Sequence, residues 1–489
     1  MAPGNAISRR AFVGATGAAV VAGTAGQVSR ASDRAQSLAE ARRGELVELL
    51  SSLIRIRSLS GESAQDAQRV VKQYLAELPY RIDESADRPS RYSDHAEFMP
   101  PNPPGDGPFV NVVGWPTESV QKRSAMFSHI DTHSMDAGWE TEPLEPVLRD
   151  NRLYGLGTSD DKGGVAAMLV AAAILAEQGG PLPVVMSLHG KGGGSRGSLP
   201  VFDRLSGSDH GIEAVLYVHP AETGRGLEDI KNAVQGVADL ELSVTGWRAP
   251  PMEIGSVDSS DWAAGGNALD MCWTLLDHLR DGVFADVQFN LGAMNGGDRI
   301  GSVADKAAAR FRLKFTGERT WRSLLGAARR EVDNFAASQG GEAGSWTFAL
   351  DPVGYRTNPG EADWNAPVSR ALRASIEDVT GQAPNAYPNH YAGDIRYPIR
   401  LLGLPAYGIG SIGGNFYGPN EWVDVDDLVR LVAVLVQTME AWGEGESSPP
   451  RYGAPRDEIR HRAPPIARGK TTTPTNVIAK AHTRERVLA

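Results

Sequence analysis

The chain of 489 residues contains a single cysteine, Cys272. One cysteine excludes an intramolecular disulfide and any metal site built from several thiolates. Positive charge is also scarce, because 49 lysine and arginine residues stand against 60 aspartate and glutamate residues and the net charge is −11. That balance does not favour a nucleic-acid partner. The sequence has no uninterrupted run of 18 apolar residues, so we expect no membrane span.

The two ends of the chain differ from the rest. Arg9 and Arg10 follow a serine and precede Phe12 and a mildly apolar Ala/Gly/Val segment. This order is typical of a twin-arginine signal, so we expect export to the periplasm or the extracellular space. We assign residues 1–35 to the signal. Residues 446–489 are rich in Pro, Arg and Thr, and we expect a mobile polar tail there.

Three short apolar runs each end in polar side chains. The runs are "SAMFSHIDTH", "PVVMSLHGKGG" and "AVLYVHPAET", and the polar residues are His129, Asp131, His133, His189, Lys191, His219 and Glu222. Continuous apolar runs of this length are typical of parallel strands that are buried on both faces. Ligands of open α/β sheets bind at the carboxyl ends of such strands. The three runs therefore predict one site at this edge of a sheet.

Two adjacent aspartates stand before a predicted helix. Asp160 and Asp161 follow a glycine-rich turn and precede an Ala/Leu/Val segment that predicts a helix from about residue 163 to 177. One of the two can cap the helix, because a carboxylate suits its positive end. The second is not needed for capping, so we expect it in the site.

The pattern changes near residue 240 and changes back near residue 352. In between, strand-like and helix-like segments follow in the order β-α-β-β-α-β, which is the split ferredoxin-like unit. We therefore expect an α/β catalytic domain in two segments, 36–237 and 352–445, with an α+β lid domain inserted over residues 238–351.

The stretch "SHIDTH…GWETEPLEPVLRDNRLYGLGTSDDKGGVAA", residues 128–167, resembles the zinc family of acetylornithine deacetylase, succinyl-diaminopimelate desuccinylase, aminoacylase, carnosinase and bacterial glutamate carboxypeptidase. "GSRGS" at 194–198, "AGDIR" at 392–396 and "GPNEWVDVDDL" at 418–428 match further motifs of that family. The resemblance implies a zinc-exopeptidase-like mixed sheet flanked by helices, with a ferredoxin-like lid through which many members dimerise. It also implies two zinc ions that share an aspartate and a water, with a glutamate as general base.

Part of this site is kept and part is replaced. His129 matches a metal-binding histidine, Asp131 the aspartate that orients it, and Asp160 the bridging aspartate. The replaced positions are Lys191 for the catalytic glutamate, Gly192 for a glutamate ligand, His219 for an acidic ligand, Tyr417 for a histidine ligand and Pro250 for the lid histidine.

These replacements predict the loss of one metal site, because glycine has no ligand atom and tyrosine is a poor zinc ligand near neutral pH. His129, Asp160 and His219 remain as a set that suits one Zn²⁺. The alternative is a metal-free cluster in which the Lys191 ammonium replaces the missing cation and pairs with Asp160. We therefore expect one zinc ion or none.

Three functions remain open. The first is an exported hydrolase of an amide or peptide-like bond in a small amino-acid-derived substrate. The second is a metal-independent enzyme of another class, catalysing a cyclisation, condensation or lyase-type step with Lys191. The third is a binding protein without catalysis.

The predicted catalytic residues are Asp131, His133, Lys191, His219 and Tyr417, with His189 and Glu222 as further candidate bases. The predicted substrate-binding residues are Arg196, Asp394 and Arg396. The expected partners are a small or dipeptide-like substrate and a second copy of the chain, bound through the lid domain.

The loop "LHGKGGGSRGS", residues 188–198, is not a phosphate-binding loop. Such a loop places its lysine after the glycines, directly before a helix, whereas Lys191 comes first here.

Overall fold

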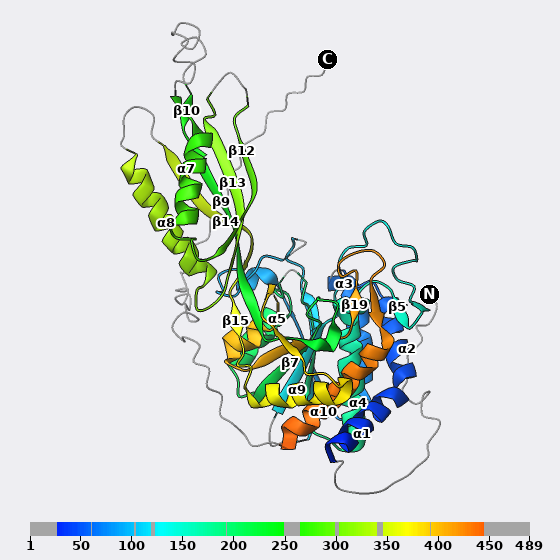
Figure 1. Ribbon diagram of the computed structural model, residues 1–489. Helices are drawn as coiled ribbons and strands as arrows, with labels where there is room; N and C mark the ends of the chain where they lie inside the picture. The colour runs from blue at the N-terminus through cyan, green and yellow to red at the C-terminus, as the bar shows by residue number, and fades with distance from the viewer. Residues whose placement is uncertain are drawn as a thin grey trace, which may run out of the picture. The chain divides into compact units, whose positions relative to one another are not determined.

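A computed structural model describes residues 27–59, 61–101, 104–118, 123–191, 193–248, 265–298, 303–339, 346–391 and 393–444 (Figure 1). The twin-arginine motif, Gly192, Pro250 and the predicted tail from residue 446 lie outside the described residues.

An eight-stranded mixed sheet carries the predicted site edge. Its order is β1 (Tyr80–Asp87), β2 (Phe109–Pro116), β6 (Val184–Leu188), β3 (Arg123–His129), β7 (Ile212–Val218), β18 (Ala406–Ile409), β8 (Asp229–Lys231) and β16 (Asn385–Tyr387). Strands β6, β3, β7 and β18 run parallel, and β1 and β2 are antiparallel to their neighbours. The three apolar runs are β3, β6 and β7, side by side and almost wholly buried, as expected.

Helices cover both faces of this sheet (Figure 1). They are α1 (Gln27–Ala41), α2 (Arg43–Ile54), α3 (Gly61–Ala76), α4 (Gly163–Gln178), α5 (Ser198–Ser206), α9 (Pro367–Thr380) and α10 (Val425–Glu444). Helix α4 is buried from Gly163 to Leu175, because it packs between β3 on one side and α2 and α10 on the other. A helix that is apolar all round suits such a position. Within the described residues, no helix has the length and apolar character needed to cross a membrane.

A second sheet has its own core. Its elements follow in the order β9 (Ala233–Thr245), α7 (Ala268–Asp281), β12 (Gln288–Gly296), β13 (Lys306–Phe315), α8 (Trp321–Ser338) and β14 (Thr347–Thr357). The strand order is β12-β13-β9-β14, with all neighbours antiparallel, and α7 and α8 pack on it. This is the β-α-β-β-α-β order that the sequence predicts.

Strand β9 begins at Ala233, before the predicted start of the inserted domain at residue 238. Its first residues pair with β15 (Gly360–Glu361) and β17 (His390–Tyr391), and its last residues pair with β13 and β14. Two smaller sheets join β10 (Trp247–Arg248) to β11 (Gly265–Gly266), and β19 (Gly413–Gly414) to β20 (Trp422–Asp424), β5 (Arg152–Tyr154) and β4 (Val147–Arg149).

Candidate active site

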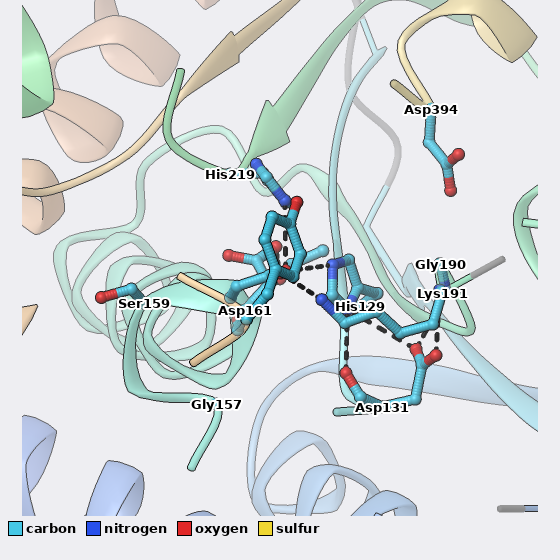
Figure 2. A network of polar contacts seen from close by, with 12 residues as sticks. His129, Asp131, Gly157, Ser159, Asp161, Gly190, Lys191, His219 and Asp394 are labelled. Carbon is cyan, nitrogen blue, oxygen red and sulfur yellow. Dashed lines mark hydrogen bonds and ion pairs between the residues drawn. The ribbon is translucent and has the colours of Figure 1, made fainter. Parts of the chain in front are cut away.

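The carboxyl ends of β3, β6 and β7 bring the predicted polar residues together (Figure 2). His129 is the last residue of β3, and Lys191 and His219 follow β6 and β7 within three residues. His129 and His219 are 4% exposed, and the Lys191 side chain is 10% exposed. The cluster is therefore shielded from most of the solvent, which strengthens its electrostatic interactions.

Asp160 is the centre of the cluster. Its Oδ1 lies 2.9 Å from His129 Nε2 and 3.3 Å from His219 Nε2, and its Oδ2 pairs with the Lys191 ammonium. One carboxylate thus faces two imidazoles through one oxygen and an ammonium through the other. Lys191 therefore has the position that the sequence predicts for it in a metal-free cluster.

Asp131 organises the loop that carries Lys191. Its two oxygens accept hydrogen bonds from the backbone N–H groups of Gly190 and Lys191, both at 2.9 Å, and Oδ2 lies 3.3 Å from His189 Nε2. Burial acts to raise the pKa of Asp131, but the neighbouring histidines and these hydrogen bonds keep it below its usual value. Asp131 is therefore an ionised residue that fixes the start of the loop.

The histidines of the cluster differ in charge. Burial and Lys191 act to lower the pKa of His129, but its close contacts with Asp131 and Asp160 outweigh them and raise it to about 10. Burial lowers the pKa of His133 and His189 to about 4, and that of His219 to about 3. Without a metal, the imidazolium of His129 and the ammonium of Lys191 therefore lie beside the carboxylates of Asp131 and Asp160.

Glu421 holds the turn that presents Asp160. It accepts backbone hydrogen bonds from Gly157 at 2.8 Å, Ser159 at 2.7 Å and Asp160 at 2.9 Å. Gly157 has a φ of 82°, which favours glycine. Glu421 was not among the predicted site residues, although it lies in the motif "GPNEWVDVDDL" that carried part of the resemblance.

Asp161 does not cap helix α4, contrary to the expectation for one of the two aspartates. Its Oδ2 accepts a hydrogen bond from Ser128 Oγ at 2.6 Å, and the residue before α4, Lys162, makes no side-chain capping bond. Burial raises the pKa of Asp161 well above its usual value. Asp160 therefore faces the cluster, whereas Asp161 hydrogen-bonds to Ser128 of β3.

Tyr417, Glu222 and His133 lie at the open side of the cluster. The Tyr417 hydroxyl donates to Glu222 Oε1 at 2.6 Å, and its ring lies 4.8 Å from Lys191 Nζ and 4.4 Å, edge-on, from the His133 ring. Glu222 Oε1 is 3.8 Å from His219 Nε2. Burial and Asp160 raise the pKa of Glu222. Tyr417 is 44% exposed, so the cluster meets solvent on this side.

Lys231 is a second lysine of the site, and it was not predicted. It lies in β8, is wholly buried, and its Nζ is 2.7 Å from His219 Nδ1 and 4.8 Å from the centre of the Tyr217 ring. Burial lowers the pKa of Lys231 to about 8. No motif surrounds Lys231 in the sequence, so nothing in the local pattern could have identified it.

The three predicted substrate-binding residues contact the chain itself. Arg396 is wholly buried and donates to Gly193 O at 2.8 Å, Asp394 accepts from Ser198 Oγ at 2.5 Å, and Arg196 donates to Gly105 O at 2.9 Å. These contacts hold the loop between β6 and α5. Their role in substrate binding stays a prediction.

The residues present do not fit a centre of two metal ions. Lys191 already pairs with Asp160 Oδ2, and the Tyr417 ring lies 4.8 Å from Lys191 Nζ, so neither side chain offers a metal-ligand atom there. His129, Asp160 and His219 have the donor atoms for one ion, within 4.8 Å of one another. Asp160 Oδ1 is buried and receives no well-aligned hydrogen bond, which favours a cation between the two rings.

The two histidines of that trio are not equivalent as ligands. A metal-bound histidine donates its other ring N–H to an acceptor. His129 meets this condition, because its Nδ1 is 3.1 Å from Asp131 O. His219 has an ammonium at its Nδ1, so it does not fit as the site stands.

A mixed sheet covered by helices, with a polar cluster at the carboxyl ends of its parallel strands, is typical of an α/β enzyme. The model of Peptidase family M20/M25/M40 matches residues 125–441, and the chain belongs to this family. It is 23% identical over 414 residues to a succinyl-diaminopimelate desuccinylase of Pseudomonas fluorescens, covering 80% of this chain and 96% of that protein.

Solved structures share the fold. The di-peptidase Dug1p of Saccharomyces cerevisiae has a TM-score of 0.60 and 13% identity, over 86% of this chain and 100% of that one. A dinuclear metal binding peptidase of family M20 from Bacillus subtilis has a TM-score of 0.56 and 12% identity, over 82% and 98%. At these identities the likeness shows the fold alone.

Proposed function

We propose that this protein is an exported hydrolase of an amide or peptide-like bond in a small amino-acid-derived substrate, and that Lys191 replaces one metal ion of a two-metal centre. The ion pair between Lys191 and Asp160 carries the proposal. An ammonium at this place supplies positive charge where the carbonyl oxygen of a substrate becomes negative. The proposal includes a homodimer formed through the second sheet and its helices.

The ion pair also indicates whether Lys191 acts as a cation or as a nucleophile. A lysine that forms a Schiff base must offer a free nitrogen lone pair to the substrate, whereas the Lys191 nitrogen is engaged with Asp160. An ammonium has three N–H donors, and Asp160 takes one of them. Lys191 therefore suits a role as a cation and hydrogen-bond donor better than a role as a nucleophile.

Glu222 is the carboxylate that we propose as general base. It takes a proton from a water molecule, whose oxygen bonds to the carbonyl carbon while the carbonyl electron pair moves onto the oxygen facing Lys191. When that pair returns, the C–N bond breaks and the leaving nitrogen receives the proton from Glu222. Tyr417 holds Glu222 in place through its 2.6 Å hydrogen bond. The products are a carboxylic acid and an amine.

The substrate class follows from the relatives. Their names describe removal of a succinyl group from an amino acid and cleavage of dipeptides. We therefore propose N-acyl amino acids and dipeptides as the first compounds to test.

Lys191→Met is the variant that tests this proposal. On a panel of N-acyl amino acids and dipeptides, we expect the wild type to release free amine and Lys191→Met to lose on the order of 10²–10³-fold in kcat/KM. Lys306→Met removes an exposed lysine of β13 and is the matched control, with unchanged kcat/KM. Equal activity of Lys191→Met and wild type would refute the role of Lys191.

The isotope composition of the product separates the candidate reactions. Hydrolysis in H₂¹⁸O places one ¹⁸O atom in the new carboxyl group. A cyclisation, condensation or lyase-type step incorporates none, and a binding protein gives no product.

A further inference from the structure

We propose that Lys231 holds His219 in the tautomer that carries its proton on Nε2, so that His219 donates to Asp160 and is withheld from metal binding. This inference deepens the proposed function and rests on the same centre. Its consequence is a centre in which lysine ammonium groups and protons take the places of both metal ions.

The first argument is the position of Lys231 at Nδ1. The two nitrogens are 2.7 Å apart, and an ammonium carries only donors. Nδ1 must therefore accept, with its lone pair toward Lys231, which leaves the ring proton of neutral His219 on Nε2. Nε2 then lies 3.3 Å from Asp160 Oδ1 as a donor, without a lone pair for a metal.

Pro220 O offers the competing arrangement. It is 2.8 Å from His219 Nδ1 and would accept the proton of the other tautomer. That tautomer sets an N–H against the ammonium of Lys231 at hydrogen-bond distance, so two donors would face each other. The ammonium therefore decides between the two arrangements.

The second argument is that the fold makes room for Lys231. Gly408 in β18 lies opposite Lys231, and a Cβ there would be 2.3 Å from Lys231 Cε. The ring of Tyr217 covers the ammonium from another side. The packing of Gly408 and Tyr217 around Lys231 therefore holds its Nζ at His219.

The third argument is the contrast with His129. Both rings face Asp160 Oδ1 through Nε2, but Nδ1 of His129 faces a carbonyl oxygen and Nδ1 of His219 faces an ammonium. The observation that favours a metal is that Asp160 Oδ1 is buried and accepts no well-aligned hydrogen bond. Lys191 already pairs with the other oxygen of that carboxylate, and the two Nε2 atoms lie 2.9 and 3.3 Å from Oδ1.

Zn²⁺ affinity of Lys231→Met tests the inference. Methionine keeps the length and apolar body of the side chain and removes its donors, so His219 can move its proton to Nδ1 and offer Nε2 as a ligand. In the metal-stripped full-length protein, we expect Zn²⁺ affinity to rise at least tenfold over wild type, measured by calorimetry. We expect the double variant Lys231→Met/His219→Ala to lose that gain.

Lys162→Met is the matched control. Lys162 is also a wholly buried lysine, but its Nζ donates to Leu53 O and Ile56 O, away from His219. We expect no gain of Zn²⁺ affinity in this variant. The inference is overturned if the wild type binds one equivalent of Zn²⁺ tightly and the Zn²⁺ affinity of Lys231→Met is equal or weaker.

Nitrogen NMR of the wild type gives a second, independent measurement. In ¹⁵N-histidine-labelled, metal-free protein, the His219 signals, assigned by their loss in His219→Gln, should show the pattern of an Nε2–H tautomer. An Nδ1–H pattern refutes the inference even where Lys231→Met does not fold. Neither measurement uses turnover, so the hydrolase proposal and this inference can fail separately.

Discussion

Asp160 and the residues around it show how single side chains decide the chemistry of this centre. The two oxygens of one carboxylate face different partners, two imidazoles on one side and an ammonium on the other. Removing one partner of a buried charge pair is costly, because it leaves the other charge without compensation. Substitutions at Lys191 or His129 therefore need a stability measurement beside the activity measurement.

Glu421 predicts a pH dependence of stability at the same scale. Burial and Asp160 raise its pKa from 4.5 to about 7, against the lowering effect of its three backbone hydrogen bonds. Between these two values the folded chain keeps a proton that the unfolded chain has lost. The contribution of Glu421 to the free energy of unfolding is therefore largest below about pH 4.5 and falls as pH rises to about 7.

Glu421→Gln should remove up to about 3 kcal/mol of that pH dependence. The amide also places an NH₂ group among the three backbone donors, so we expect lower stability at every pH. Urea unfolding of wild type and variant at pH 4.5 and 7.5 measures both effects. If the free energy of unfolding changes equally between these two pH values in wild type and Glu421→Gln, Glu421 does not hold this proton.

Helix α4 shows how an element places the site. Its first turn lies so close to β7 that a Cβ on Gly164 would be 2.0 Å from Val218 O and 2.6 Å from Asp161 Oδ1. This close approach sets the position of the two aspartates relative to His219, which follows Val218. The glycine is therefore part of the site geometry although it has no side chain.

Gly164→Ala should cost about 1–3 kcal/mol of unfolding free energy, because backbone must move to admit a methyl group. Gly326→Ala in α8 is the matched control, since its Cβ would meet only Arg330 Nη1 at 3.7 Å. Alanine favours a helix interior, so the control should gain up to about 1 kcal/mol. Chemical denaturation measures the free energy of unfolding of both variants. An equal change in Gly164→Ala and Gly326→Ala would contradict the packing argument.

At the scale of the whole molecule, the proposed export depends on Arg9 and Arg10. Helix α1 begins at Gln27, and its residue Ser32 donates to Asp378 O at 3.0 Å, so the chain is already part of the folded domain there. We therefore place signal cleavage before Ser32, within the residues 1–35 that the sequence assigns to the signal. Replacing both arginines by lysine should leave the folded protein in the cytoplasm.

Cell fractionation of a tagged protein in a host with a twin-arginine pathway measures this outcome. Arg42→Lys and Arg43→Lys in the folded domain are the control, with export unchanged. Normal export of the Arg9→Lys/Arg10→Lys variant would contradict the signal assignment.

The amino-acid sequence by itself determined the buried parallel strands, the turn with two aspartates and the family resemblance. These features depend on patterns within a few dozen residues, such as continuous apolar runs and glycines at fixed spacing. Lys191 was predicted to reach Asp160 because the resemblance placed both at one edge of the sheet.

Only the tertiary structure decided the partners of His219 and Asp160. Glu421 lies 261 residues from Asp160 along the chain, and Lys231 reaches His219 from a strand at the far side of β18. Neither contact has a signal in the local sequence, because each arises from the order of strands in the sheet and the packing between them. The tautomer of His219, and with it the ability of His219 to bind a metal ion, is therefore a property of the folded molecule.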